Sequence, residues 1–241
     1  MTEYCRPASV DEAVELLVAH EGGARVIAGG TDVLPDLRRG RIAPTCLIDV
    51  TRIPELGRIE VGDDFVRVGA AVTFAQIKSH PLIARRVPAL AAAAGSVGAA
   101  AIQSTATWVG NIVQAMPAAD GAVVAVALEA EARVVDAAGA VWRPVEALFE
   151  GPGVSAVDPT RQLVTGIRFP LREGRWGTAW ERVGRRPSLV LPILNCAVSL
   201  QLDAVEERVV HAVVAMGPVA PRPFRARGAE AALVGQRPAG E

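Results

Sequence analysis

Two adjacent glycines between an apolar run and an amphipathic segment constrain the fold of this chain more than any other feature. The apolar run at residues 24–27 leads into Ala-Gly-Gly-Thr-Asp at residues 28–32, and residues 32–39 then have the pattern of a short helix. In such a strand-turn-helix, backbone N–H groups approach an anion without Cβ obstruction, and the helix start adds unpaired donors and a positive dipole end. The pattern therefore suits a diphosphate, although a tight turn before a helix capped by Thr31 or Asp32 is an equally simple explanation.

Length and composition exclude several classes of protein. A chain of 241 residues that is 51% hydrophobic and 21% charged can bury a substantial core, in one large domain or two smaller ones. The net charge is −1 and the arginines are dispersed, so the sequence has no basic patch that would bind nucleic acid. The N-terminus lacks a signal-peptide core and the longest apolar stretches are interrupted, so we expect a cytoplasmic protein with no transmembrane segment.

The cysteines and histidines form no local metal-binding pattern. Cys5, Cys46 and Cys196 are far apart, and no histidine pair accompanies them. We therefore expect buried or incidental thiols, with neither a zinc site nor an iron–sulfur cluster. No Ser/His/Asp spacing or paired-carboxylate motif stands out, so we expect no catalytic side chain and no metal ligand in this chain. If the protein is an enzyme, a bound cofactor does the chemistry.

The hydrophobic periodicity predicts three successive regions. Residues 1–57 hold a capping box at residues 9–12, a helix over residues 10–20 and strands near residues 25–28 and 46–50, which together make a small α/β unit. In residues 58–172 we expect hairpins at 59–69 and 133–142, a capping box at 73–76, helices at 89–94 and 122–131, a strand at 163–169, and an extended loop over 95–111. Residues 173–241 should contain antiparallel strands at 191–202 and 209–216, and a helix at 225–234.

A second polar loop is a natural partner for the glycine turn. Hydroxyl and amide groups of Thr31, Thr107 and Asn111 suit phosphate oxygens, and the carboxylate of Asp120 suits a ribose or flavin-tail hydroxyl. Two facing loops of this kind would hold one extended dinucleotide. Neither loop has the Gly-x-Gly-x-x-Gly spacing of the Rossmann fingerprint, so a nicotinamide site of that type is not supported.

The order and spacing of these motifs resemble the FAD-binding medium subunits of molybdenum hydroxylases, the family that includes xanthine dehydrogenase, carbon monoxide dehydrogenase and 4-hydroxybenzoyl-CoA reductase. The resemblance covers nearly the whole chain, through residues 28–32, 47–50, 68–73, 110–111, 116–120, 151–153, 185–186 and 220–223. It implies an α+β fold, in which a two-part FAD-binding domain of the vanillyl-alcohol-oxidase (PCMH) type precedes a small C-terminal domain with a three-stranded antiparallel sheet and helices. The FAD would lie between the two parts, at residues 1–57 and 58–172.

The resemblance also assigns residues to the FAD site by their position. Residues 26–33 correspond to the first diphosphate loop, residues 107–111 to the second, and Asp120 to a ligand of the cofactor's polar tail. Three further positions line the flavin or adenine in the family, although the two valines among them would equally suit the core. The complete set is Val26, Ile27, Ala28, Gly29, Gly30, Thr31, Asp32, Val33, Val97, Thr107, Trp108, Val109, Gly110, Asn111, Asp120, Val164 and Arg182.

This chain departs from the family pattern in two places. The second loop usually has Thr-x-Gly-Gly-Asn, but Val109 occupies the first glycine position, where a β-branched residue would be strained if the backbone needs a positive φ. In the upstream Gly-x-x-Gln-Ile-Arg-Asn, three polar side chains are lost or shortened, at Ala101, Gln103 and Ser104. These differences bear on flavin affinity or on redox tuning. The chain also ends at Glu241, where relatives continue, which implies a short third domain or one completed by a partner.

The function implied by the resemblance is electron transfer within an oxidoreductase complex. FAD on this chain would exchange electrons with [2Fe–2S] clusters on a small partner subunit and with an acceptor such as NAD or a quinone. Substrate oxidation would take place at a molybdenum–pterin centre on a large subunit. Two alternatives stay open: a structural subunit whose flavin site has degenerated, and a stand-alone flavin oxidase on the same fold.

Overall fold

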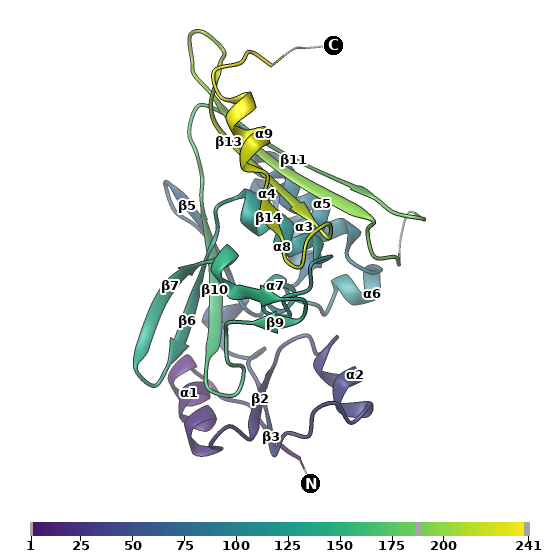
Figure 1. Cartoon of the computed structure of the whole chain (residues 1–241). Helices are drawn as coiled ribbons and strands as arrows, with labels where there is room; N and C mark the ends of the chain where they lie inside the picture. Colours follow the sequence, from purple (N-terminus) through teal and green to yellow (C-terminus); the bar gives the residue numbers. More distant parts are fainter. Residues whose placement is uncertain (1, 187–188, 239–241) are drawn as a thin grey trace.

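The computed structural model describes residues 2–186 and 189–238, and its N-terminal part is a small parallel α/β unit. Its sheet has the order β1-β3-β2, and both neighbouring pairs are parallel. The strands are β1 (Glu3–Cys5), β2 (Ala24–Ile27) and β3 (Cys46–Asp49), connected through helices α1 (Val10–Ala19) and α2 (Val33–Arg38). Ser9 caps α1 by accepting a hydrogen bond from the N–H of Glu12, as the capping box predicts. Figure 1 shows this unit in purple at the end of the molecule opposite α9.

The parallel pairing of β1 with β3 corrects the expectation that the cysteines are dispersed. The Sγ atoms of Cys5 and Cys46 lie 3.3 Å apart, although the residues are distant in the sequence. Only Cys196, on a strand of the C-terminal region, is remote from the other two. No local spacing in the sequence indicates this pair, because the two strands pair only after a crossover through α1, β2 and α2.

The second part is built on a five-stranded antiparallel sheet in the order β4-β5-β10-β6-β7. Its strands are β4 (Ile59–Val61), β5 (Phe65–Gly69), β6 (Glu131–Asp136), β7 (Gly139–Pro144) and β10 (Leu163–Pro170), and β8 (Phe149–Gly151) pairs with β9 (Val154–Ser155) outside this sheet. Its helices are α3 (Phe74–Ser79), α4 (Pro81–Arg86), α5 (Pro88–Ser96), α6 (Ala100–Gln103), α7 (Trp108–Val113) and α8 (Asp120–Ala127), with short 3₁₀ turns η1 (Pro54–Gly57) and η2 (Val145–Leu148). The predicted capping box at Thr73 and Gln76 is confirmed at the start of α3.

The prediction of an extended loop over residues 95–111 is wrong. This segment contains α6 and most of α7, which span only four and six residues. Helices of four and six residues are too short to show a hydrophobic period in the sequence. Thr107 is the N-cap of α7, and its hydroxyl accepts a hydrogen bond from the N–H of Gly110 at 3.1 Å.

The C-terminal region is a four-stranded antiparallel sheet in the order β11-β12-β13-β14, followed by a helix. The bounds are β11 (Arg175–Val183), β12 (Leu194–Leu202), β13 (Val209–Gly217), β14 (Phe224–Arg225) and α9 (Arg227–Leu233). The strand β11 was not predicted because its side chains alternate between partly buried and exposed, with no apolar run. Three long strands therefore match the implied sheet, and the two-residue β14 extends it.

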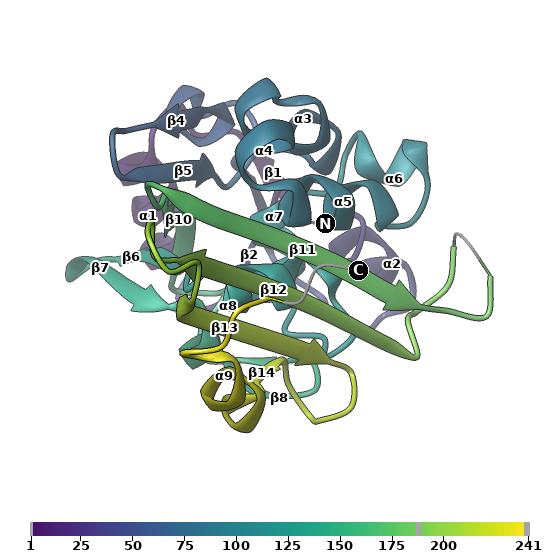
Figure 2. The same ribbon diagram turned by 90° about the horizontal axis from the view of Figure 1, so that it is seen from above.

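The C-terminal sheet and the second part share one hydrophobic core. Figure 2 shows β11, β12 and β13 as a layer that runs across α5 and α8. Every residue of α8 is buried, and Ala197 and Ala215 of the sheet belong to the same core cluster as the helix. Among the helices of the described residues, none is long and apolar enough to cross a membrane.

Candidate functional site

The glycine turn lies between β2 and α2, as the sequence predicts, and its two glycines are needed for different reasons. Gly30 has a φ of +68°, in the left-handed region that favours glycine. A Cβ on Gly29 would lie 2.0 Å from the carbonyl oxygen of Thr105, so only glycine lets the turn contact the segment before α7. The turn of the first part therefore touches the second part directly.

The backbone of this turn presents a row of free donors. Within the described residues, the N–H groups of residues 29–32 donate to no backbone or side-chain acceptor. The carbonyl of Gly30, in contrast, accepts from the N–H of Leu34 in the first turn of α2. Unpaired N–H groups at consecutive positions before a helix form the kind of concavity that binds phosphate oxygens.

The first turn of α7 faces the same space and corrects the expectation about Val109. Val109 is the second residue of this helix, is 4% exposed, and is not among the residues with positive φ. The backbone strain expected there is therefore absent, because the position that carries a glycine in the family pattern has helical geometry in this chain. The side-chain Oδ1 of Asn111, two residues further along, is buried and has no hydrogen-bond partner among the described residues.

A cavity of about 680 Å³ lies between the glycine turn and α7. This volume is within the range of about 300–1,000 Å³ that is usual for small-molecule and cofactor sites. Most of the residues assigned from the resemblance line it: Val26, Ala28, Gly29, Gly30, Thr31, Asp32, Val33, Val97, Thr107, Val109, Gly110, Asn111 and Val164. The two parts of the predicted FAD-binding domain thus contribute opposite walls of one cavity.

Four of the assigned residues do not line this cavity. Ile27 is buried beneath the turn at the end of β2. Trp108 is fully buried, and its indole N–H donates to the carbonyl of Gly121 at 2.9 Å. The remaining two, Asp120 and Arg182, form an ion pair at 3.1 Å, with side chains that are only 6% and 10% exposed.

The carboxylate of Asp120 is occupied by other protein groups. Its Oδ2 accepts from the hydroxyl of Ser96 at 2.8 Å and from Arg182, and its Oδ1 accepts from the Nδ2 of Asn195 at 2.7 Å. Arg182 donates in addition to the carbonyl of Val190 at 3.0 Å. These bonds connect α8 and α5 of the second part with β11 and β12, so Asp120 lies at the junction with the C-terminal sheet.

Several polar cavity residues were not predicted from the sequence. Arg25 lines the wall formed by β2. Burial lowers the pKa of its guanidinium, although the negative charges of Asp36 and Asp158 partly offset this effect. Burial also raises the pKa of Asp32, although a hydrogen bond from Thr31 opposes this effect. The sequence signal for Arg25 was its position as the one charged residue in the apolar run before the turn. Gln114 and Gln162 add amide groups to the rim.

Comparison with known proteins gives two family matches that together span most of the chain. Residues 1–172 match the family described as "FAD binding domain in molybdopterin dehydrogenase". Residues 179–241 match the "CO dehydrogenase flavoprotein C-terminal domain".

Individual relatives resemble the chain over almost its full length. The xanthine dehydrogenase FAD-binding subunit of Escherichia coli O157:H7 is 30% identical over 228 residues, which cover 94% of this chain and 77% of the relative. The carbon monoxide dehydrogenase medium chain of Hydrogenophaga pseudoflava is 30% identical over 234 residues, covering 97% and 80%.

Solved structures have the same fold. Carbon monoxide dehydrogenase from Hydrogenophaga pseudoflava, in a form that lacks the Mo-pyranopterin moiety of the molybdenum cofactor, aligns with a TM-score of 0.91 at 31% identity, over 99% of this chain and 82% of that one. Reconstituted CO dehydrogenase from Oligotropha carboxidovorans aligns with a TM-score of 0.89 at 27% identity, over 98% and 81%.

Proposed function

Since the chain belongs to the family of FAD-binding medium subunits of molybdenum hydroxylases, we propose that it transfers electrons between [2Fe–2S] clusters on a small partner subunit and an external acceptor. It is the flavoprotein component of an oxidoreductase complex. The oxidised substrate would react at a molybdenum–pterin centre on a large subunit, and the acceptor would be a molecule such as NAD or a quinone. Bound FAD supplies chemistry that links one-electron and two-electron partners.

The observation that carries this proposal is the set of free N–H groups at residues 29–32, which line the same cavity as the first turn of α7. A diphosphate between them would accept hydrogen bonds that these donors do not make within the protein. Asn111 also lines this cavity and adds a side-chain amide to it. The residues present therefore fit FAD.

The side chains around the cavity have separable roles in the proposal. Gly29 and Gly30 let the backbone approach the diphosphate, and Thr107 holds α7 in place through its cap. Val97 and Val164 would cover the apolar faces of the rings. Arg25 would offset part of the diphosphate charge, because its guanidinium lies in the cavity wall.

The same contacts support the proposed division into residues 1–57, 58–172 and 173–241. The first two segments supply all of the residues that line the cavity, which end at Val164. The third segment supplies a separate antiparallel sheet that packs on α5 and α8. The FAD site would therefore depend on the first two segments directly and on the third through packing.

The test uses the complex purified with its partner subunits. We expect one flavin for each copy of this chain in its visible spectrum, and we expect the flavin to be reduced by a one-electron donor and reoxidised by NAD or a soluble quinone. A stoichiometric complex without flavin absorbance would support the degenerate, structural subunit instead. A flavin that turns over a small substrate on the isolated chain would support the stand-alone oxidase.

A further inference from the structure

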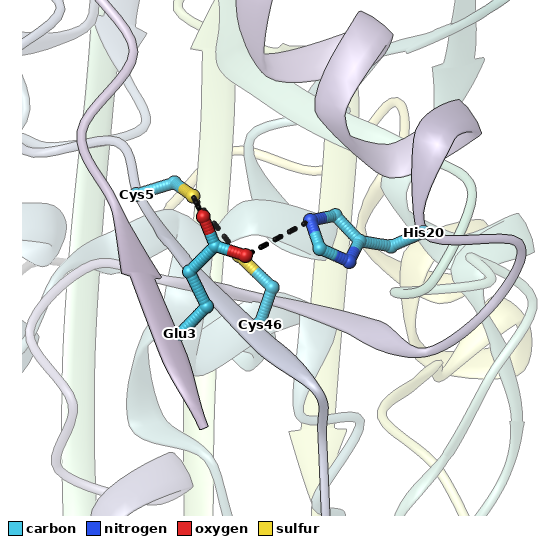
Figure 3. A group of neighbouring side chains, drawn as sticks. All are labelled: Glu3, Cys5, His20 and Cys46. Atoms are coloured by element: carbon cyan, nitrogen blue, oxygen red, sulfur yellow. Dashed lines mark hydrogen bonds and ion pairs between the residues drawn. The ribbon is translucent and has the colours of Figure 1, made fainter. Parts of the chain in front are cut away.

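Four potential metal ligands converge at one end of the N-terminal sheet. Figure 3 shows Glu3 and Cys5 from β1, His20 from the end of α1, and Cys46 from the start of β3 with their side chains directed toward one another. One ligand atom from each residue lies within 4.8 Å of all the others. The cluster is separate from the FAD cavity, since none of the four residues lines that cavity.

Hydrogen bonds and one ion pair connect the four side chains of the cluster. The thiol of Cys46 donates to the Sγ of Cys5 at 3.3 Å, and the thiol of Cys5 donates to a carboxylate oxygen of Glu3 at 3.4 Å. The other oxygen of Glu3 lies 3.9 Å from Nε2 of His20. Cys46 is buried and Glu3 is exposed, so the cluster extends from the core of the unit to its surface.

The fold brings these groups together through strand register and one turn. Glu3 is the register partner of Cys46, and Cys5 is the partner of Ile48, so the two cysteines occupy diagonal positions on the same face of the sheet. His20 ends α1, and the N–H of Gly23 donates to its carbonyl at 2.7 Å. The N–H of Thr45 donates in turn to Gly23, which holds this turn beside the start of β3.

This geometry favours a bridging metal over a disulfide. Diagonal positions on adjacent strands have Cα atoms about 8 Å apart, given a strand spacing of about 4.8 Å and a rise of about 3.3 Å per residue. A disulfide requires a Cα separation of about 4.4–6.8 Å. Two thiolates on one tetrahedral zinc ion, each with a Zn–S bond of about 2.3 Å, lie about 3.8 Å apart. The observed Sγ separation of 3.3 Å is much closer to that value than to a covalent S–S bond.

We propose that these four side chains bind one zinc ion. Two thiolates and one imidazole select a borderline-soft ion over Mg²⁺ or Ca²⁺, which prefer oxygen ligands. Four protein ligands close the coordination sphere, so the site is structural. The ion would join β1, the end of α1 and β3 into one unit, next to the strand β2 that leads into the glycine turn.

The test uses the full chain, purified in reducing, metal-free buffer and then given one equivalent of ZnCl₂. After removal of unbound metal, we expect one zinc per chain by elemental analysis, and a higher melting temperature than without zinc. X-ray absorption at the zinc edge should show two sulfur neighbours at about 2.3 Å and two nitrogen or oxygen neighbours. Zinc content and zinc coordination do not depend on flavin content. The zinc proposal can therefore be overturned while the proposed function stands.

The variants distinguish the site from adventitious zinc. Cys5→Ser and His20→Asn should each lose the bound zinc and the shift in melting temperature, and Cys196→Ser, the third cysteine, should retain both. Cys46→Ser removes a buried thiol and could prevent folding. The test therefore relies on Cys5→Ser, which changes a less buried cysteine. The proposal is overturned if the wild type retains no zinc, if Cys5→Ser retains as much as Cys196→Ser, or if anaerobically purified protein has a Cys5–Cys46 disulfide and no zinc.

Discussion

The second part of the chain meets its two neighbours in opposite ways. Its contact with the N-terminal unit leaves a cavity of about 680 Å³, and the N–H groups of residues 29–32 in that wall have no partner within the described residues. Its contact with the C-terminal sheet is filled, with every residue of α8 buried and the carboxylate of Asp120 satisfied by three side chains. The difference indicates that one junction is shaped to accept a cofactor and the other to hold the protein together.

A second polar network strengthens the filled junction. Glu129, which follows α8, forms ion pairs with Arg172, His211 and Arg225. Arg225 also pairs with Glu230 of α9 at 2.8 Å, and both side chains are largely buried. Charges this well paired tie the C-terminal strands to the second part at defined positions, because an unpaired buried charge would be costly.

The largest expected effect on flavin binding is at the open junction, in Gly29→Ala. The new Cβ would lie 2.0 Å from the carbonyl oxygen of Thr105, so the turn must move away from the segment before α7. Overpacking of this size costs about 1–3 kcal/mol, and we expect FAD affinity to fall by about tenfold or more. The ratio of flavin to protein in the purified complex measures this loss. The matched control is Gly57→Ala, at an exposed glycine with no atom within 4 Å of the added Cβ; equal flavin content in the two variants would contradict the prediction.

The largest expected effect on the free energy of unfolding is at the filled junction, in Asp120→Ala. Removing this carboxylate leaves Arg182 buried without its ionic partner, which we expect to lower the free energy of unfolding by about 3–5 kcal/mol. Denaturant unfolding measures the change, and Asp120→Asn should lose less because the amide oxygen still accepts a hydrogen bond. If Asp120 is instead a flavin ligand, as the family position suggests, flavin content would fall in both variants while their stability stayed near that of the wild type.

Val109→Gly tests the geometry of α7 and should have a smaller effect. Restoring the family's glycine removes a side chain that is 4% exposed and places glycine within a helix. We expect about 2–3 kcal/mol of lost stability and no gain in FAD occupancy. Thermal unfolding and flavin content are measured together, with Val18→Gly on the exposed face of α1 as the control for helix propensity alone. An increase in bound flavin would show that Val109 obstructs the cofactor.

The smallest expected effect is the pH dependence of the Glu129 network. Burial raises the pKa of this carboxyl, but the charges and hydrogen bonds of His211 and Arg225 outweigh that effect and lower it below its usual 4.5. A carboxyl whose pKa is lower in the folded state than in the unfolded state stabilises the protein at pH values above the unfolded pKa. This stabilisation is lost as the pH falls through the pKa of the folded state. We therefore expect the free energy of unfolding to decrease as the pH falls below 4.5. The decrease should be shallower in Glu129→Gln, and unchanged in Glu15→Gln, an exposed position of α1 with no ion pair among the described residues.

Local patterns made the glycine turn and the capping boxes predictable. The Gly-Gly pair needs only its own neighbours to define a strand-turn-helix, and Thr73 with Gln76 encodes the start of α3 within four residues. The segment before Asn111 was not predictable in the same way. The helices α6 and α7 are too short to show a hydrophobic period, and the hydroxyl of Thr107 caps α7 through Gly110 only after the turn has formed. The family pattern located the cavity residues in the sequence, but it did not provide the backbone conformation at Val109.

Contacts between distant segments were beyond the reach of the sequence. Asp120 has the position of a cofactor ligand, but its partners come from α5, β11 and β12, whose packing no local pattern encodes. The proximity of Cys5 and Cys46 likewise follows from the parallel pairing of β1 with β3. In both cases the chemistry of the residues was visible, and the tertiary contacts that decide their role were not.

The close approach of Gly29 to Thr105 has a consequence for how the protein unfolds. A ligand that contacts both walls of the cavity adds its binding free energy to the association of the N-terminal unit with the second part, beyond what their shared core contributes. Bound FAD would then be a cooperative element of the fold, so that the flavin-loaded chain melts in one transition. Without flavin, the cavity walls would lose that contribution, and the chain would melt at a lower temperature.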